Sequence, residues 1–326
     1  MTGTQPAGPM TIGLLCGREY SFPPAFIERV NTLGRPHGIT AEFVKLAGTK
    51  MDEAPPWRVI VDRISHEVEY YRGFLKHAAL NGTYVINNPF WWTADDKFFN
   101  YAVASKLGVA IPKTVLLPQK AYPSDVDILP ASLRNLDYPL DWDGLLDYVG
   151  RPAILKPFSG GGWKHVYKVH NKEELLAAYD VTGPYCMTLQ QFINFDQYVR
   201  CFTFGQTDIT PVRYDVHERK YLVEHEYLSS DLGARIVRDA QTLNTALGYE
   251  MNTIEFAVQD GIPYAIDFLN PAPDFERDRI TPHYFDLVID KMSNLVIDRA
   301  LNGKVQRSWP RWAQMVGLSD AAAGPV

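Results

Sequence analysis

The chain has few cysteines, no long apolar run and no dense block of positive charge, and each absence excludes a class of protein. Three cysteines among 326 residues do not provide a disulfide framework or a cysteine-rich zinc site. No uncharged apolar run approaches the ~20 residues of a membrane-spanning helix. The 32 basic and 38 acidic residues give a net charge of -6, which does not suit a phosphate backbone. We therefore expect a cytoplasmic protein that binds neither membrane nor nucleic acid.

What is present is the composition of a globular protein. The chain is 46% hydrophobic and 21% charged, which excludes wholesale disorder. Its length allows about two or three domains of ~100–200 residues each. Residues 1–10 and 309–326 are rich in small residues and lack a secretory signal, so we expect disordered tails there.

Strands and helices alternate over the first ninety residues. This spacing predicts a doubly wound α/β domain over residues 11–92. The expected strands are 11–17, 40–46, 59–61 and 84–86, and the expected helices start at Pro23 and His66 and end at Gly34 and Asn81.

The rest of the chain mixes short strands with helices. Thr93 and Asp96 resemble a capping box at the start of a helix. Residues 118–152 lack periodicity and predict an inserted loop that contains a helix over 141–149. Further helices are expected over 231–247 and 284–301.

A glycine-rich segment follows a strand that ends in Lys156. The segment contains Ser159, Gly160, Gly161 and Gly162 and precedes another strand, so it matches neither the Walker loop nor the dinucleotide fingerprint. Glycines let backbone N–H groups converge on an anion, while a strand lysine supplies positive charge. The pattern favours a phosphate-binding loop; the alternative is a glycine-rich hairpin with a surface lysine.

Two carboxylates lie in a hairpin near the end of the chain. A two-residue turn at Asp260-Gly261 would put Ile266 opposite Glu255, whereas an odd-length loop would put Asp267 there. We expect the odd loop, because two facing carboxylates suit a hard cation such as Mg²⁺. Asn270 could add an oxygen ligand. The alternative is that both carboxylates face solvent on an edge hairpin.

A third set of residues has the chemistry of a nucleotide site. Lys97 lies on the capped helix, a hinge strand with exposed backbone groups could bind an adenine edge, and a carboxylate after it could bind ribose. The hinge and the residues after it are Gln190, Gln191, Phe192, Ile193, Asp196 and Arg200.

The order of these motifs resembles the ATP-grasp superfamily. From Asn88 to Pro273 the chain reads N-P-x-x-x-x-x-x-D-K, G-x-x-x-P-K-T, I-L-K-P-F-S-G-G-G, L-Q-Q-F-I, Y-V-R-C-F and I-E-F followed by A-I-D-F-L-N-P. It looks most similar to the branch of RimK-type ligases, glutathione synthetases and D-alanine:D-alanine ligases. The resemblance implies an α/β fold in which a doubly wound domain precedes two α+β lobes around ATP. The implied boundaries are 11–92, 93–188 for the central lobe and 189–308 for the C-terminal lobe.

The resemblance also implies roles for the candidate residues. Lys97, Lys156 and residues 159–162 would bind ATP phosphates, residues 190–193 adenine, and Asp196 ribose. Glu255, Asp267 and Asn270 would bind two Mg²⁺, with Mn²⁺ as an alternative metal. Arg200 would steady an acyl phosphate and act with Lys156 in catalysis.

The chain departs from the superfamily pattern near the metal site. Asp267 stands where Glu is commoner, and Asn270 follows at three positions where two are usual. Asn270 can reach a metal only if a bulge or turn begins near Phe268.

The implied activity is an ATP-dependent carboxylate-amine ligase that works as a monomer or homodimer. Its acid substrate, small molecule or peptide, would meet a cationic cluster of Arg213, His217, Arg219 and Lys220, which could equally be a solvated hairpin turn. The alternatives are a kinase of the same fold, which phosphorylates a hydroxyl, and a nucleotide-binding module without catalysis.

Overall fold

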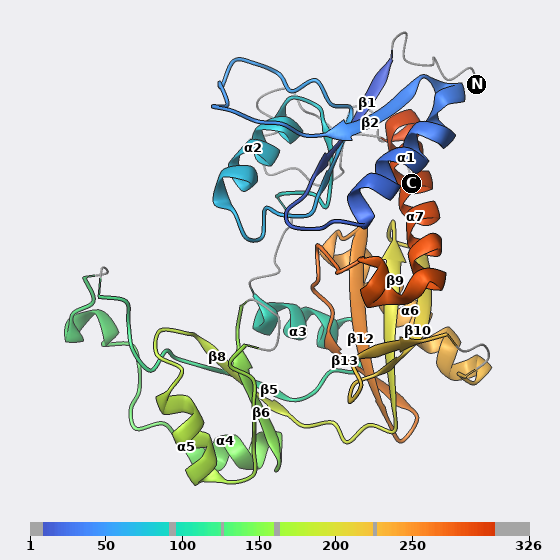
Figure 1. Cartoon of the computed structure of the whole chain (residues 1–326). Helices are drawn as coiled ribbons and strands as arrows, with labels where there is room; N and C mark the ends of the chain where they lie inside the picture. Colours follow the sequence, from blue (N-terminus) through green and yellow to red (C-terminus); the bar gives the residue numbers. More distant parts are fainter. Residues whose placement is uncertain (1–8, 91–95, 125–126, 160–163, 224–226, 304–326) are drawn as a thin grey trace.

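The computed structural model contains three β-sheets with helices packed on them (Figure 1). It describes residues 9–90, 96–124, 127–159, 164–223 and 227–303. Within these ranges no helix combines the length and apolarity needed to cross a bilayer.

The N-terminal sheet is parallel, with strand order β2-β1-β3-β4. Its strands are β1 (Met10–Leu15), β2 (Ile39–Phe43), β3 (Val59–Asp62) and β4 (Tyr84–Ile86). Its helices are α1 (Phe22–Gly34), followed by the short 3-10 turn η1 (Arg35–His37), and α2 (Glu69–Leu80). The doubly wound arrangement is as expected, although β1 starts at Met10, inside the segment expected to be a tail, and α2 starts three residues after His66.

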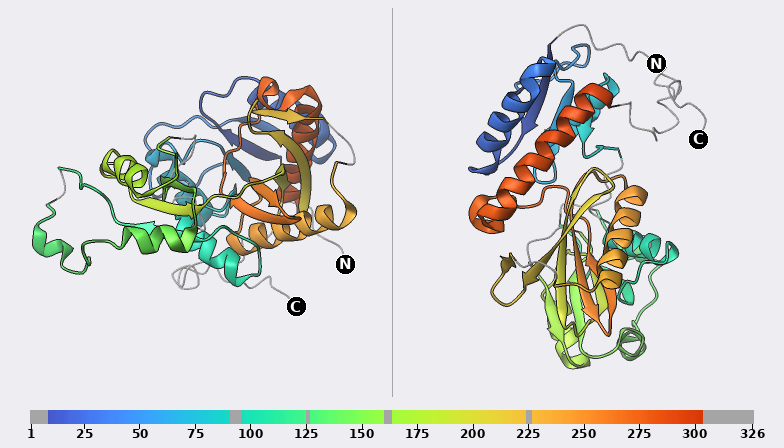
Figure 2. Two further views of the ribbon diagram at one scale, coloured as in Figure 1. Left: turned by 90° about the horizontal axis from the view of Figure 1, so that it is seen from below. Right: turned by 90° about the vertical axis from the view of Figure 1, so that its right-hand side faces the viewer.

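The last helix also covers this sheet. The helix α7 (Arg277–Asn302) packs beside α1 on one face, while α2 covers the other (Figures 1 and 2). It begins earlier than the predicted residue 284, and Thr281 breaks it with a φ of 70°. Pro282 explains the break, because a proline disfavours helical geometry at the residue before it.

A second, four-stranded antiparallel sheet has the order β5-β8-β6-β7. Its strands are β5 (Thr114–Leu117), β6 (Ala153–Pro157), β7 (Tyr167–Val169) and β8 (Met187–Gln191). The helices α4 (Trp142–Val149) and α5 (Lys172–Asp180) pack on it, and the 3-10 turn η2 (Pro130–Leu133) lies before α4. The helix α3 (Lys97–Lys106) contacts β5 but buries Tyr101 and Ala104 in the core of the third sheet. The helix predicted over 141–149 is confirmed.

The third sheet is antiparallel, with five strands in the order β11-β10-β9-β12-β13. Its strands are β9 (Gln197–Phe204), β10 (Asp208–Asp215), β11 (Lys220–Leu222), β12 (Met251–Gln259) and β13 (Ile262–Asp267). The helix α6 (Ser230–Leu247) packs on one face and ends, as predicted, at Gly248, which has a φ of 73°. The other face carries the polar residues described next.

Candidate active site

The β12–β13 hairpin places Glu255 and Asp267 directly opposite each other. The expected odd-length loop is wrong, because the strands are joined by the two-residue turn Asp260-Gly261, in which both residues have positive φ. This turn alone would put Ile266 opposite Glu255. A β-bulge leaves Ile266 unpaired and moves Asp267 into that position. The predicted pairing is confirmed, but the bulge produces it.

Arg200 extends this pair into a row across three strands. It lies opposite Glu255 on the neighbouring strand β9, and its Nη2 is 2.5 Å from Glu255 Oε1. Tyr198, two residues earlier, donates its hydroxyl to the other oxygen of Glu255. Burial, together with the charge of Glu255 and the hydrogen bond to it, raises the pKa of Tyr198, so this hydroxyl remains a donor. Glu255 is therefore held by two groups on one strand.

Lys97 contacts the Asp267 end of the row. It is the first residue of α3, and its Nζ lies 3.2 and 3.1 Å from the two carboxylate oxygens of Asp267. The helix starts here because the side chain of Asp96 accepts a hydrogen bond from the N–H of Phe99 at 2.8 Å. The expected helix start at Thr93 lies outside the described residues.

Lys156 approaches the same place from β6. Its Nζ donates to the Tyr101 hydroxyl at 2.8 Å and to the Ile266 carbonyl at 3.2 Å. The structure thus brings Lys97, Lys156, Glu255, Asp267 and Arg200 together from four strands and one helix.

The cluster carries more positive than negative charge, with three cations against two carboxylates. Burial acts to raise the pKa of Asp267, but the ammonium groups of Lys97 and Lys156 outweigh it and hold that pKa below its usual value. Burial lowers the pKa of Lys156, against the opposite effect of Asp267 and Glu255. The Asp267 side chain is 41% exposed, so a ligand can approach it.

The chain leaves β13 directly after Asp267 in a turn held by Asn252. The Asn252 side chain donates to the Phe268 carbonyl at 2.8 Å and accepts from the Asn270 N–H at 2.8 Å. A turn therefore begins near Phe268, as Asn270 needs in order to lie near the carboxylates. Asn270 itself is exposed, and its role as a metal ligand stays a prediction.

The predicted hinge continues from β8 toward β9. Gln190 is buried and donates to the Thr114 hydroxyl at 2.9 Å, while the Gln191 side chain accepts from the Lys113 N–H at 3.2 Å. Lys168 lies 3.8 Å from the centre of the Phe192 ring. The side chains of both glutamines are thus used within the sheet. An adenine site here would depend on backbone groups.

The flanking hinge residues differ in exposure. Ile193 is buried, whereas Asp196 is exposed and its backbone N–H donates to the Val258 carbonyl at 3.0 Å. Ser159 is exposed at the end of β6, and the predicted phosphate-binding glycines Gly160, Gly161 and Gly162 lie outside the described residues.

The predicted substrate cluster occupies the β10–β11 hairpin. All four of its side chains are exposed, and acidic residues accompany them, since Lys220 pairs with Glu218 at 3.3 Å and Asp215 caps the turn. The members are Arg213, His217, Arg219 and Lys220. The hairpin meets the charged row through Tyr214 and Tyr221, whose ring centres lie 3.8 and 5.5 Å from the Arg200 guanidinium.

The donor chemistry of the row fits a hard divalent cation. Glu255 and Asp267 present carboxylate oxygens on one face, and an oxygen that accepts one hydrogen bond retains a second lone pair. In the described part of the chain, no group of three or more His, Cys, Asp or Glu side chains forms a metal cage. Two facing carboxylates are oxygen donors of the kind that Mg²⁺ accepts together with other oxygen ligands.

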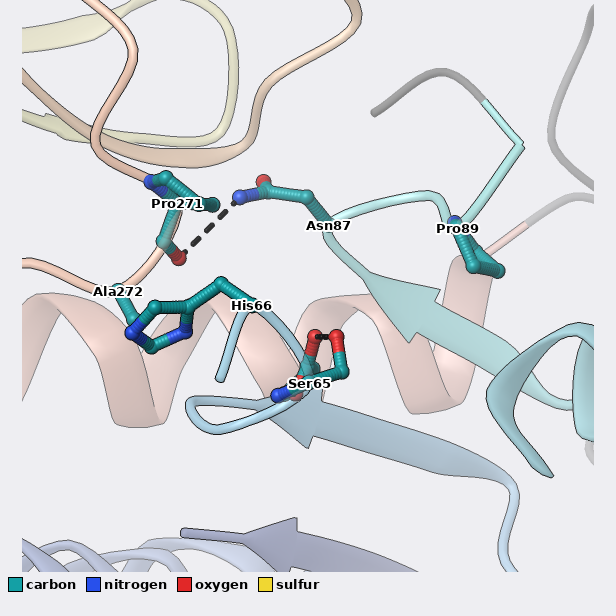
Figure 3. Close-up of a pocket in the computed structure, with 7 residues that line it drawn as sticks. Ser65, His66, Asn87, Pro89, Pro271 and Ala272 are labelled. Atoms are coloured by element: carbon teal, nitrogen blue, oxygen red, sulfur yellow. Dashed lines mark hydrogen bonds between the residues drawn. The ribbon is translucent and has the colours of Figure 1, made fainter. Parts of the chain in front are cut away.

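A small pocket lies between the segments that follow β3 and β4 and the turn after β13 (Figure 3). Ser65, His66 and Asn87 line it from the carboxyl ends of β3 and β4, opposite Pro271 and Ala272. The Asn87 amide donates to the carbonyls of Met251 and Pro271, at 2.8 and 3.4 Å. With a volume of about 10 Å³, this cavity has room for about one water molecule and is too small for a substrate.

Sequence reasoning missed three residues that support the site, Tyr101, Tyr198 and Asn252. Two carried a readable signal. Tyr101 follows Lys97 by four residues and so shares its helix face, and Tyr198 precedes Arg200 by two and shares its strand face. Asn252 carried no such signal, because its partners Asn244, Phe268 and Asn270 lie on α6 and after β13.

The comparisons with known proteins bear on the fold. No protein-family model and no curated protein matches the sequence. Among solved structures, a RimK domain ATP-grasp protein from Sphaerobacter thermophilus has a TM-score of 0.63 at 17% identity and covers 87% of this chain and 98% of its own. The ATP complex of a D-alanine–D-alanine ligase from Bacillus anthracis has a TM-score of 0.55 at 17% identity, covering 89% and 96%.

A third similar structure was solved with a peptide. It is the macrocyclase MdnC from Microcystis aeruginosa bound to its precursor peptide MdnA, with a TM-score of 0.59 at 14% identity and coverage of 88% and 99%. All three similarities extend over almost the whole of both chains. The predicted fold is confirmed, and this chain has the ATP-grasp fold.

Proposed function

We propose that the protein is an ATP- and Mg²⁺-dependent ligase that joins a carboxylate to an amine through an acyl phosphate. The observation that carries this proposal is the row of Arg200, Glu255 and Asp267 with Lys97 and Lys156 at one end. A net positive cluster with a partly exposed carboxylate suits a metal-bound polyphosphate. The carboxylates can bind the metal while the lysines and Arg200 bind the phosphate oxygens.

Each residue of the row has a role in this proposal. Lys97 and Lys156 bind phosphate oxygens of ATP. Glu255 and Asp267, with Asn270, hold Mg²⁺, which when bound offsets the charge of the transferring phosphoryl group. Arg200 neutralises the developing charge on the acyl phosphate, and Tyr198 keeps Glu255 oriented.

The proposed reaction has two steps. A carboxylate oxygen of the acid attacks the γ-phosphorus of ATP, the bond to the bridging oxygen breaks, and ADP leaves. The nitrogen of the amine then attacks the acyl carbon, inorganic phosphate leaves, and the nitrogen loses a proton. The first step is needed because a carboxylate is a poor electrophile toward an amine.

The remaining predicted residues complete the proposal. The backbone of residues 190–193 and the side chain of Asp196 bind adenosine, residues 159–162 cover the phosphates, and the exposed cations of the β10–β11 hairpin attract the acid. We retain the division into 11–92, 93–188 and 189–308.

Solved structures of the same fold support this class of reaction. The structures named above include a D-alanine–D-alanine ligase solved with ATP and a macrocyclase solved with a precursor peptide. Both a small-molecule acid and a peptide acid therefore belong in the substrate screen.

The test is a screen of acids with ATP and Mg²⁺ in which hydroxylamine replaces the amine. A ligase forms a hydroxamate from the acid and releases one phosphate per ADP. A kinase of the same fold forms ADP and a phosphorylated product without free phosphate. A binding module shows neither product, although it binds Mg-ATP, and either of these results would overturn the proposal.

A further inference from the structure

The β-bulge at Ile266 determines which residue faces Glu255, so the contacts that hold the bulge bear on the site. An unpaired residue in a ladder leaves its carbonyl without a strand partner, and a buried carbonyl without a hydrogen bond is costly. Here the Ile266 carbonyl accepts from the Tyr101 hydroxyl at 2.8 Å and from Lys156 Nζ at 3.2 Å.

Tyr101 is placed for this contact by α3. It follows Lys97 by one helical turn, so the two side chains lie on the same face of the helix. Lys97 contacts Asp267, while Tyr101 contacts the carbonyl of the preceding residue. The Tyr101 ring also packs edge-on against Phe268, with ring centres 5.4 Å apart. One face of α3 therefore contacts Ile266 and Asp267 at the end of β13 and Phe268 directly after it.

The Tyr101 hydroxyl has a second contact with the proposed machinery. It accepts a hydrogen bond from Lys156 Nζ at 2.8 Å while it donates to Ile266. Tyr101 is only 3% exposed, so water does not compete for these bonds. A phenylalanine would keep the ring packing and remove both bonds.

We infer that Tyr101 is a positioning residue, whose hydroxyl holds the bulge at Ile266 and the ammonium of Lys156 so that Asp267 faces Glu255. The inference rests on the proposed function for its catalytic consequence, but the bulge itself can be tested without any substrate. Tyr101 contacts no reacting atom in this scheme and acts through Lys156 and Asp267.

Tyr101→Phe tests this inference against a matched control, Tyr179→Phe. Tyr179 is 5% exposed and likewise donates its hydroxyl to a backbone carbonyl, that of Pro118 at 2.6 Å, but it packs in the core of the four-stranded sheet. The first measurement is amide hydrogen exchange of the nucleotide-free protein over residues 264–269. We expect Tyr101→Phe to speed exchange there by about fivefold, as the loss of one net hydrogen bond implies, and Tyr179→Phe to leave it unchanged.

The second measurement is steady-state kinetics with ATP. We expect kcat to fall by about tenfold or more in Tyr101→Phe, with KM for ATP within about threefold of the wild type, because the proposed contacts of ATP with Lys97 and with the hinge are unchanged. Tyr179→Phe should match the wild type in both constants.

The outcomes separate the inference from the proposed function. Unchanged exchange over 264–269 in Tyr101→Phe, or an equal increase in both variants, would overturn the inference whatever the enzyme does. Faster exchange with an unchanged kcat would overturn the positioning role. A wild-type protein without ATP turnover would refute the proposed function, and the exchange data would still decide whether Tyr101 holds the bulge.

Discussion

Strand β12 and the residue before it carry two clusters of the same composition, each with a tyrosine, a glutamate and an arginine. Glu255 is held by Tyr198 and Arg200. Glu250, five residues earlier, accepts from the Tyr84 hydroxyl at 2.7 Å and lies 2.6 Å from Arg299 Nη2. Both glutamates are mostly buried, and a motif search would treat the two clusters alike.

Their surroundings differ in the sign of the net charge. The Glu250 cluster joins β4 to α7, and Arg299 also pairs with Asp298 at 2.5 Å, so that one cation meets two carboxylates. Around Glu255, three cations meet two carboxylates, and the second carboxylate, that of Asp267, is partly exposed. The comparison teaches that a buried Tyr-Glu-Arg set is not itself a site. An unbalanced positive charge beside an accessible carboxylate makes it a candidate for binding a polyphosphate.

The largest expected difference between the clusters is in turnover. Glu255→Gln should lower ATP-dependent turnover by about 10²–10³-fold, because it removes a charged group of a preorganised site. Glu250→Gln should stay within about threefold of the wild type. The measurement is phosphate release with ATP, Mg²⁺ and the acid found in the screen. Equal losses of turnover in Glu255→Gln and Glu250→Gln would contradict the distinction between the two clusters.

Replacement of Lys156 should have an effect of similar size. Lys156→Ala should lower turnover by about 10²–10³-fold, since it removes a buried charge that contacts the bulge. Lys172→Ala is the control, because Lys172 forms an exposed ion pair with Asp143 at 2.6 Å on the outer helices. An active Lys156→Ala enzyme would contradict the assigned role.

The pH dependence of kcat/KM for ATP should show the lowered pKa of Lys156. Burial lowers this pKa, so the ammonium charge that binds phosphate is lost as pH rises through a value below the ~10.4 of an ordinary lysine. We expect activity to fall on this alkaline limb. Lys156→Arg should be less active but should lack the limb, since arginine stays charged. If the wild type and Lys156→Arg lose activity over the same alkaline pH range, the loss belongs to a group other than Lys156.

The smallest expected effect is on stability, and it belongs to the Glu250 cluster. Glu250→Gln should lower the free energy of unfolding by about 1–3 kcal/mol, because Arg299 loses a charged partner in a half-buried place. Asp298→Asn should cost about 0–1 kcal/mol, since Asp298 is about half exposed. Urea titration measures both. A larger loss for Asp298→Asn would show that Glu250 does not anchor α7.

The fold could be predicted from the sequence because the order of its motifs resembles the ATP-grasp superfamily, while the alternation of strands and helices indicated the N-terminal α/β domain. The sequence also predicted that Glu255 and Asp267 lie opposite each other, but it did not predict the bulge that causes this pairing. The odd-length loop that we expected would give the same pairing as the observed two-residue turn followed by a bulge at Ile266. The contacts of this bulge come from Tyr101 on α3 and Lys156 on β6. Register set by side chains more than a hundred residues away cannot be read from the hairpin alone.

The sequence likewise did not predict where α7 packs. Its apolar residues predicted a helix, and nothing local indicated that it returns to the N-terminal sheet. The buried Arg63 guanidinium lies 4.6 and 5.0 Å from the ring centres of Phe22 and Phe275 and pairs with Glu19 at 2.5 Å, so it links the N-terminal sheet to the segment just before α7. Arg63 and its partners lie in three segments that are far apart in the sequence, so their contacts form only in the folded chain.

The most direct test of the account is the effect of Mg²⁺ on ATP binding to the wild type, Glu255→Gln and Glu250→Gln, measured by calorimetry. The account predicts that Mg²⁺ tightens ATP binding by about tenfold or more in the wild type and in Glu250→Gln, and that Glu255→Gln loses this effect. The same Mg²⁺ dependence in all three proteins, or no binding of ATP to the wild type, would contradict it.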